Sequence, residues 1–500
     1  MLSLIFRRRS FERDARRLLT FALLLSALTA PPTRSAGESA WKNNPHDPVQ
    51  SSLQNDGALP RGRLIERVAL RDDATQGYAL YLPSGYTPDK RWPILYCLDP
   101  LARGEVPVAR FLAAAEKYGW IVAGSHNSRN GAVKTSLDAT VAMWNDTRAR
   151  LSIDERRIYA AGFSGGARMS VRFGYLCRGC LAGVVACGAG FPADIKPSAD
   201  VPFPVYAIAG TEDFNFPELK KLDAALDKFS VPHRLALFDG AHAWPPAEAC
   251  AAALEWMELQ ALKSGRLRRD ETLIEQLWQE QKRRAHVAEE ARNFYDAYRN
   301  YEAAANDFRG LRDVSGLEGQ AARLRRTREV GRALDEEDGQ IRRQHQLAGE
   351  LVALLEQRRD PEQGAVASIA FRKAVDDLRK AARADADTGA RRVARRALKQ
   401  VFAQFYEGAN NLIRSRENYA LAVVSLEAAA ELAPDDPHVL YELARAHALN
   451  RDKRKAFDAL RKAIERGFKD AADLERNEAF EALRAEAEYR KLVESIGQTR

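Results

Sequence analysis

The sequence predicts an α/β fold, a doubly wound and mostly parallel sheet, followed by an all-α domain of helical repeats. In the first half of the 500-residue chain, short apolar runs alternate with helical patterns, which is typical of parallel strands joined by helices. From about residue 267, glycine and proline become rare and Glu, Arg, Ala and Leu dominate, which indicates helices. Near the end, small and apolar residues recur at a spacing of 34.

The apolar runs of the first half give the expected strands and helices in order. The strands are expected at 64–71, 77–82, 93–98, 120–125, 158–163, 181–188, 204–209 and 234–238. The helices are expected at 106–118, 135–151, 166–176, 217–229 and 246–263. Because parallel strands bring their carboxyl ends to one edge, where ligands bind, we expect a site among the residues that follow these strands.

The segment Gly162-Phe163-Ser164-Gly165-Gly166 stands between an expected strand and an expected helix. A strand, G-x-S-x-G and a helix are the layout of a nucleophile elbow, in which a sharp turn lifts a serine hydroxyl out of the sheet. Glycines flank the serine because a Cβ there would collide with the neighbouring strand and helix. Ser164 is therefore the candidate nucleophile.

An acid and a base follow Ser164 in the chain. Asp213 comes after the strand at 204–209, and His242 comes after the strand at 234–238. A serine hydroxyl is a poor nucleophile until a base takes its proton. We expect His242 to be that base and Asp213 to hold its tautomer. Glu212 is an alternative acid, and Asp239 is expected to be a turn residue.

A tetrahedral intermediate also needs hydrogen-bond donors for its oxyanion. The N–H of Gly165, the residue after the serine, is one expected donor. The other is expected from the loop after the strand at 93–98, where Pro100 has no N–H and Leu101 is the preferred candidate. Asp99, at the start of this loop, is expected to cap a turn.

Three aromatic or imidazole side chains near these positions are candidates for substrate binding. Phe163 and Trp244 flank catalytic positions and are expected either to shape an acyl pocket or simply to pack. His126 lies in a polar loop after a strand, where it either touches substrate or is a solvated loop residue.

Residues 64–260 resemble the α/β-hydrolase family, close to its compact esterase- and depolymerase-type members. The resemblance rests on the segments "IDERRIYAAGFSGG", "AIAGTEDFNFPELKKL" and "LFDGAHAW", and the family's G-T-x-D pattern favours Asp213 over Glu212. It implies hydrolysis of an ester, thioester or amide without a metal or cofactor, with a small ester or polymer end as substrate. A carboxylesterase is the main expectation and a serine peptidase the alternative. The first oxyanion segment departs from the HGGG loop of lipases, which leaves its donor open.

The N-terminus has the pattern of a secretory signal. Six arginines precede an apolar stretch at 18–30 that is too short to span a membrane comfortably. We expect a signal peptide at 1–37, a linker at 38–63 and a periplasmic or secreted protein, with an uncleaved anchor as the alternative.

The five cysteines suit an oxidising compartment. Cys177 and Cys180 are close in sequence but lack the second ligand pair that a zinc site needs, so we expect a local disulfide. Cys97, Cys187 and Cys250 fall in apolar elements and are expected to be buried thiols.

The second half is expected to be a helical region at 264–400, with or without degenerate repeats, and a repeat array at 401–500. Ala422, Leu426 and Ala429 recur as Ala456, Leu460 and Ala463. This pattern resembles the tetratricopeptide repeat, whose small residues let paired helices pack closely. Such arrays present a face that binds peptides or proteins; the alternative is that the array dimerises the enzyme or covers its site.

The net charge of +8 is modest for this length, and no segment alternates basic and aromatic residues. No nucleic-acid partner is therefore expected. A non-catalytic scaffold with a vestigial hydrolase domain is the remaining alternative to an enzyme, and the complete Ser, Asp and His set favours the enzyme.

Overall fold

The computed structural model describes residues 59–358 and 360–497. The chain divides into two compact units, Met1–Asp338 and Gly339–Arg500. The predicted signal peptide at 1–37 and most of the predicted linker lie outside the described residues. Within the described residues, no helix is both long enough and apolar enough to cross a membrane.

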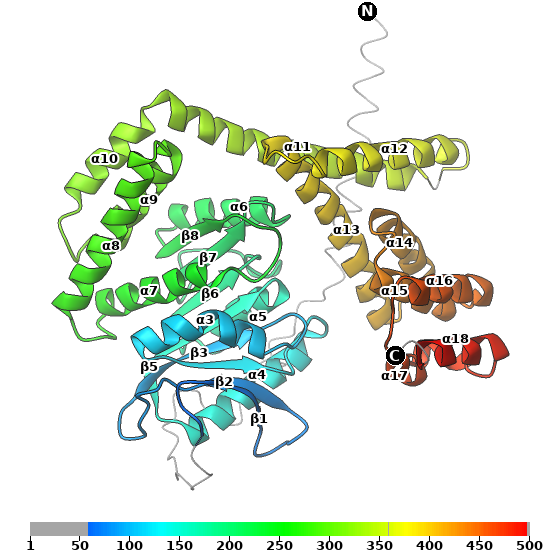
Figure 1. The fold of residues 1–500 in the computed structure, drawn as a ribbon, viewed down its shortest axis with the longest axis horizontal. Coiled ribbons are helices and arrows are strands. Elements are labelled where there is room, and N and C mark those ends of the chain that lie inside the picture. Colours follow the sequence, from blue (N-terminus) through cyan, green and yellow to red (C-terminus); the bar gives the residue numbers. More distant parts are fainter. Residues whose placement is uncertain (1–58, 359, 498–500) are drawn as a thin grey trace, which may run out of the picture. The chain divides into compact units, whose positions relative to one another are not determined.

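An eight-stranded sheet forms the centre of the first unit (Figure 1). Its strands follow the order β1-β2-β4-β3-β5-β6-β7-β8; β2 is antiparallel to both neighbours and the other pairs are parallel. A mostly parallel sheet is therefore confirmed, and every expected strand is present. The strands are β1 (Leu64–Ala69), β2 (Gly77–Tyr81), β3 (Trp92–Leu98), β4 (Ile121–Ser125), β5 (Ile153–Phe163), β6 (Gly183–Cys187), β7 (Val205–Gly210) and β8 (His233–Phe238).

Helices cover both faces of the sheet. Leu95 and Cys97 of β3 share one buried core with residues of α3 and α7. Tyr96, which points to the opposite face because strand side chains alternate, packs on Trp144 of α4 at 5.3 Å between ring centroids and bonds Thr147 at 2.7 Å. The helices of this layer system are α3 (Glu105–Tyr118), α4 (Val133–Arg150), α5 (Gly165–Leu176), α6 (Phe216–Lys228) and α7 (Ala247–Lys263).

Three further helices belong to the same unit: α8 (Glu271–Glu290), α9 (Phe294–Phe308) and α10 (Ser315–Arg325). They share an apolar core with the end of α7. The buried carboxylate of Asp307 on α9 accepts a hydrogen bond from Trp256 Nε1 of α7 at 2.7 Å and pairs with Arg234 of β8. The division of the chain thus falls at residue 338, beyond the boundary expected at 263, because these helices complete the core beside the sheet.

Removing the Asp307 carboxylate should destabilise the first unit. In Asp307→Ala, Arg234 and Trp256 Nε1 would lose their shared acceptor at a site where the acid side chain is only 4% exposed. Breaking a buried pair from one side costs about 3 kcal/mol or more. We expect the free energy of unfolding in urea to fall by about that amount. Glu290→Ala, which removes an exposed partner of His286, is the control and should change it by less than about 0.5 kcal/mol; equal effects in both variants would contradict the buried link.

The cysteines follow the expected division into one disulfide and three thiols. Cys177 and Cys180 form a disulfide, with their Cα atoms 5.5 Å apart, after α5. Cys97, Cys187 and Cys250 are free and buried. Burial raises the pKa of Cys250 to about 12 and places the pKa of Cys97 and Cys187 well above the usual value.

These thiols should resist modification in the folded protein. The thiolate is the reactive form, and burial disfavours it in all three. We expect a disulfide reagent such as Ellman's to find essentially no reactive thiol at pH 8 in the native chain and three after denaturation. Rapid reaction in the native chain would show that one of the three is accessible.

The second unit consists of helices from Gly339 onward, and α11 (Arg328–Gln357) runs through the division. Helices that follow one another in sequence pack together from α12 to α16, drawn from yellow to red in Figure 1. The predicted boundary at 400/401 falls inside α13. The remaining helices are α12 (Gly364–Ala382), α13 (Gly389–Ser415), α14 (Tyr419–Leu432), α15 (Pro437–Leu449), α16 (Lys453–Glu465), α17 (Ala471–Arg476), the 3₁₀ helix η1 (Glu478–Leu483) and α18 (Ala487–Gly497).

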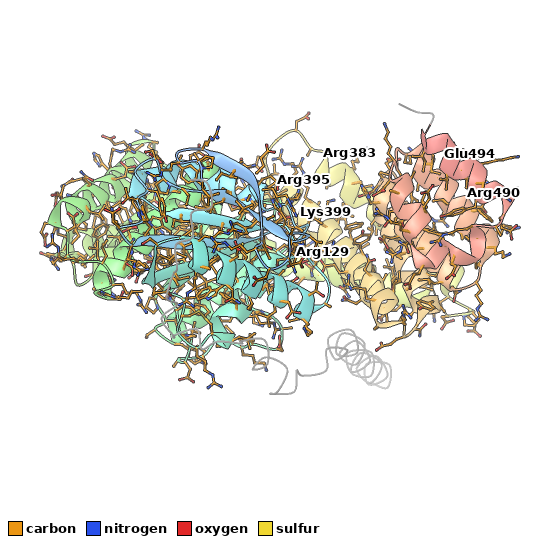
Figure 2. All side chains as sticks on the ribbon, turned by 90° about the horizontal axis from the view of Figure 1, so that it is seen from below. Arg129, Arg383, Arg395, Lys399, Arg490 and Glu494 are labelled. Atoms are coloured by element: carbon orange, nitrogen blue, oxygen red, sulfur yellow. A yellow bond between two sulfur atoms is a disulfide. The ribbon has the colours of Figure 1, made fainter. Side chains whose placement is uncertain are left out.

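The residues that define the spacing of 34 are in the core of this unit. Ala422, Leu426 and Ala429 of α14 are fully buried, and so are their counterparts on α16. Basic side chains lie where α12 and α13 meet, including Arg383, Arg395 and Lys399 in Figure 2. Arg395 Nε donates to Ala382 O at 2.8 Å, so part of the positive charge serves the helix–helix contact.

Candidate active site

Ser164 lies between the end of β5 and the start of α5. Its backbone has φ 53° and ψ −119°, a left-handed conformation that is unusual for a residue with a side chain and is seen at strained functional turns. The Ser164 N–H donates to Cys187 O of β6 at 2.8 Å. The turn predicted from the glycine pattern therefore has the backbone of an elbow.

Close backbone approach explains the glycines on both sides of the serine. A Cβ on Gly162 would lie 2.2 Å from the carbonyl carbon and oxygen of Gly166, and a Cβ on Gly166 would lie 2.0 Å from Leu98 O. Backbone atoms cannot move aside as a flexible side chain can. Only glycine fits at these two positions while the strand and helix keep their separation.

Asp213 and His242 come together at the same edge of the sheet. Asp213 is buried in the turn after β7, and both of its carboxylate oxygens lie 2.9 Å from His242 Nδ1. The Asn215 N–H donates to Asp213 Oδ1 at 2.8 Å, which fixes the carboxylate. Of the alternatives, Asp239 accepts a hydrogen bond from Thr211 instead, and the partner of His242 Nδ1 is Asp213 rather than Glu212.

The imidazole of His242 is held between two phenyl rings. Its centroid lies 4.6 Å from that of Phe163 and 4.4 Å from that of Phe214. Because Phe163 directly precedes Ser164, its contact with the imidazole places the imidazole beside the elbow. With Nδ1 turned to Asp213, Nε2 is the nitrogen left to receive a proton from a serine hydroxyl.

The two expected oxyanion donors differ in their surroundings. Gly165 is the first residue of α5, so no carbonyl of that helix can accept its N–H, and the helix N-terminus favours negative charge. The Leu101 N–H, in contrast, donates to Asp99 Oδ1 at 2.8 Å. This bond is the turn cap expected of Asp99, and it competes with the assignment of Leu101 as second donor.

Asp99 does more than cap a turn. Its buried carboxylate also accepts hydrogen bonds from Arg103 and, at 2.8 Å, from Trp244 Nε1. Burial alone would raise the pKa of Asp99, but the hydrogen bonds from Arg103, Trp244 and the Leu101 N–H together lower it below its usual value. An ionised Asp99 thus ties the loop after β3 to the segment that carries His242.

The three residues predicted to bind substrate are held by contacts within the protein. Phe163 and Trp244 are only 7% and 6% exposed and belong to the core, so they support the imidazole and its loop from within. His126 Nδ1 accepts from the Gly104 N–H at 3.3 Å, and Nε2 donates to Glu66 O at 2.7 Å. Both of its ring nitrogens therefore have backbone partners, and Nδ1 also lies 3.5 Å from Glu105 Oε2.

Sequence reasoning missed two residues of this site. Phe214 directly follows Asp213, but the sequence pattern singled out only Asp213 and Glu212 in this segment. Asn130 follows β4 in the same polar loop as His126, and its side chain lies against Gly165. No group of three or more His, Cys, Asp or Glu that could hold a metal ion occurs in residues 59–358 and 360–497.

A serine, a histidine and a buried aspartate at the carboxyl ends of β5, β8 and β7 invite comparison with known hydrolases. Residues 71–258 match the dienelactone hydrolase family. This match covers strands β2 to β8, helices α3 to α6, most of α7 and all three candidate catalytic residues. It supports a hydrolase, in particular an ester hydrolase. A search among curated proteins gives no match.

Several solved structures are similar to part of the chain. An S-formylglutathione hydrolase from Staphylococcus aureus is 18% identical, with a TM-score of 0.32, over 40% of this chain and 99% of its own. A fluorophosphonate-binding serine hydrolase from the same organism is 16% identical, with a TM-score of 0.33, over 40% and 99%. A hyperthermophilic esterase from the archaeon Pyrobaculum calidifontis is 15% identical, with a TM-score of 0.32, over 40% and 87%. The activities in these names belong to those proteins.

Proposed function

We propose that this chain is a serine hydrolase that cleaves carboxylic esters through an acyl-enzyme on Ser164. The observation that carries the proposal is the placement of His242, which is bonded to buried Asp213 and contacts the ring of Phe163, the residue before the strained Ser164. A base held by a buried acid beside a serine supports activation of the hydroxyl; the reaction further needs Ser164 Oγ to come within hydrogen-bond distance of His242 Nε2.

The chemistry follows from these groups. Ser164 Oγ attacks the ester carbonyl carbon while His242 Nε2 takes its proton. The tetrahedral intermediate collapses, the C–O bond to the alcohol breaks, and His242 returns the proton to the departing alcohol. Water then attacks the acyl-enzyme, His242 takes its proton, and the carboxylic acid leaves as the serine is restored.

Two measurements test this proposal against its alternatives. A fluorophosphonate probe should label the full chain if it has an activated serine and leave it unlabelled if the domain is a vestigial scaffold. Initial rates with short p-nitrophenyl esters and with peptide p-nitroanilides then compare esterase with peptidase. We expect labelling and a preference for the esters; efficient cleavage of only the anilides would favour the peptidase.

For the second unit we propose a tetratricopeptide-like array that binds a protein or peptide. The buried small residues on α14 and α16 at equivalent positions support it. The alternative is that the array mediates self-association, and light scattering of the full chain distinguishes the two. A monomeric mass favours a different protein or peptide as partner, and a stable dimer supports self-association.

We further propose export to the periplasm or beyond. The disulfide between Cys177 and Cys180 suits an oxidising compartment, as does the signal-like N-terminal sequence. Recovery of the mature protein from periplasmic extract or medium, with its new N-terminus sequenced, tests both the compartment and the cleavage site.

A further inference from the structure

The candidate oxyanion site lacks an evident second donor from the loop after β3. The Leu101 N–H is bonded to Asp99 Oδ1 at 2.8 Å, and Asp99 is held by Arg103 and Trp244. Turning the Leu101 N–H toward a substrate would remove one hydrogen bond from a fully buried carboxylate, which is costly. Gly165 alone would then stabilise a charge that acyl-transfer enzymes commonly share between two donors.

The side chain of Asn130 lies directly over Gly165. A Cβ built on Gly165 would be 1.8 Å from Asn130 Oδ1, 2.8 Å from Cγ and 3.3 Å from Nδ2. The amide therefore fills the space that a side chain at position 165 would take, beside the residue that follows the nucleophile. It is solvent-exposed, and no hydrogen bond to it from the described residues is present.

The backbone around Asn130 is fixed at this place. Its N–H donates to Pro100 O at 2.8 Å, and Arg129 forms an isolated bridge with Leu101. Ser136 Oγ of α4 accepts a hydrogen bond from the Arg129 N–H at 3.1 Å and donates one to the Arg129 carbonyl at 2.6 Å. The loop is thus attached both to the segment where the second donor was expected and to a core helix.

We propose that the side-chain amide of Asn130 donates the second hydrogen bond to the oxyanion, in place of the Leu101 N–H. A primary amide carries two N–H donors on Nδ2, and a half turn about its last side-chain torsion exchanges Nδ2 and Oδ1 next to Gly165. An asparagine side chain acting in this way is known to be an effective oxyanion donor in serine hydrolysis. The inference rests on the proposed function, because it assigns a role in the same reaction.

This assignment also gives a reason for glycine at position 165. Gly165 φ is not in the left-handed region, so the backbone conformation does not require glycine. Any side chain there would instead displace the Asn130 amide. Glycine at 165 and asparagine at 130 form one functional pair.

The test uses the full chain with a p-nitrophenyl ester and an arylboronic acid, which forms a tetrahedral adduct with an active serine. We expect Asn130→Ala to lower kcat by about 10²–10³-fold with little change in KM, as for loss of one such donor. The inhibition constant of the boronic acid should rise in parallel, because it samples transition-state binding. Arg129→Ala, which removes an exposed side chain from the same loop, should behave as wild type.

Asn130→Asp separates donation from packing. It keeps the size of the side chain but replaces Nδ2 by an oxygen that accepts, so its kcat should fall at least as far as that of Asn130→Ala. Wild-type kcat in either variant would overturn the assignment of Asn130 while leaving the esterase intact. A wild-type chain with neither ester hydrolysis nor fluorophosphonate labelling would instead refute the proposed function itself, and this assignment with it.

Discussion

Replacing Ser164 with alanine is expected to lower kcat for a short p-nitrophenyl ester by about 10⁴–10⁶-fold, the scale seen when a catalytic serine is removed. The hydroxyl is the only group at the elbow that can form the acyl-enzyme, and the residual rate would come from oxyanion donors and binding alone. Because Ser164 Oγ makes no hydrogen bond with a described residue, its loss should leave the free energy of unfolding nearly unchanged. The substitution removes only the hydroxyl and keeps the Cβ, so it does not relieve the backbone strain at φ 53°.

The chain contains a matched control for this variant. Ser230 is an exposed serine that also has φ 53°, but it precedes β8 and lies at the opposite end of that strand from His242. Ser230→Ala should keep full activity and full labelling by the fluorophosphonate. Labelling that persists in Ser164→Ala would mean that another residue is the nucleophile.

The sequence predicts the sheet and the turn at Ser164 well because both depend on local patterns. The strands of the parallel region are continuous apolar runs between helical segments, so their positions are readable without tertiary information. The elbow is recognisable because its glycines flank the serine in sequence; Gly162 is required by a contact four residues on, and Gly166 by Leu98 of the neighbouring strand β3.

Features that depend on competition between distant groups could not be predicted in this way. Leu101 follows the family position, but the Asp99 side chain takes its N–H. His126 is polar and lies in a loop, yet its Nε2 is hydrogen-bonded to the carbonyl oxygen of Glu66, sixty residues earlier. Phe163 and Trp244 are close in sequence to candidate catalytic residues, yet both lie in the core. Phe163 points there because side chains alternate along β5, and Trp244 because its Nε1 donates to Asp99. For His126 and Trp244 a partner far along the chain decides the role, whereas the competitor of Leu101 lies only two residues before it.

The end of the first compact unit at residue 338 has no signal in the sequence, for a related reason. From about residue 267 the composition is helical throughout, so it carries no mark where one compact unit ends and the next begins. The link between Asp307 and Arg234, which joins α9 to the sheet, is a pair of ordinary charged residues seventy-three positions apart.

Replacing Asp213 with asparagine is expected to lower kcat by about 10⁴-fold while leaving the fold intact. An asparagine at this position would offer His242 Nδ1 either a neutral acceptor or an N–H donor. With an N–H donor, the imidazole would take the tautomer that carries its proton on Nε2, the atom that must accept the proton of Ser164. A neutral acceptor would also stabilise the imidazolium less than the carboxylate that now has both oxygens 2.9 Å from Nδ1.

Asp239→Asn provides the matched control, because it makes the same chemical change in the turn after the neighbouring strand, where the carboxylate accepts from Thr211. We expect wild-type kcat for Asp239→Asn and, for Asp213→Asn, slow but complete labelling by the fluorophosphonate, since Ser164 is still present. This combination distinguishes loss of the acid from loss of the nucleophile, because the Ser164→Ala variant should not be labelled at all. If the two asparagine variants lost activity equally, or only Asp239→Asn lost it, then Asp213 would not be the acid that orients His242.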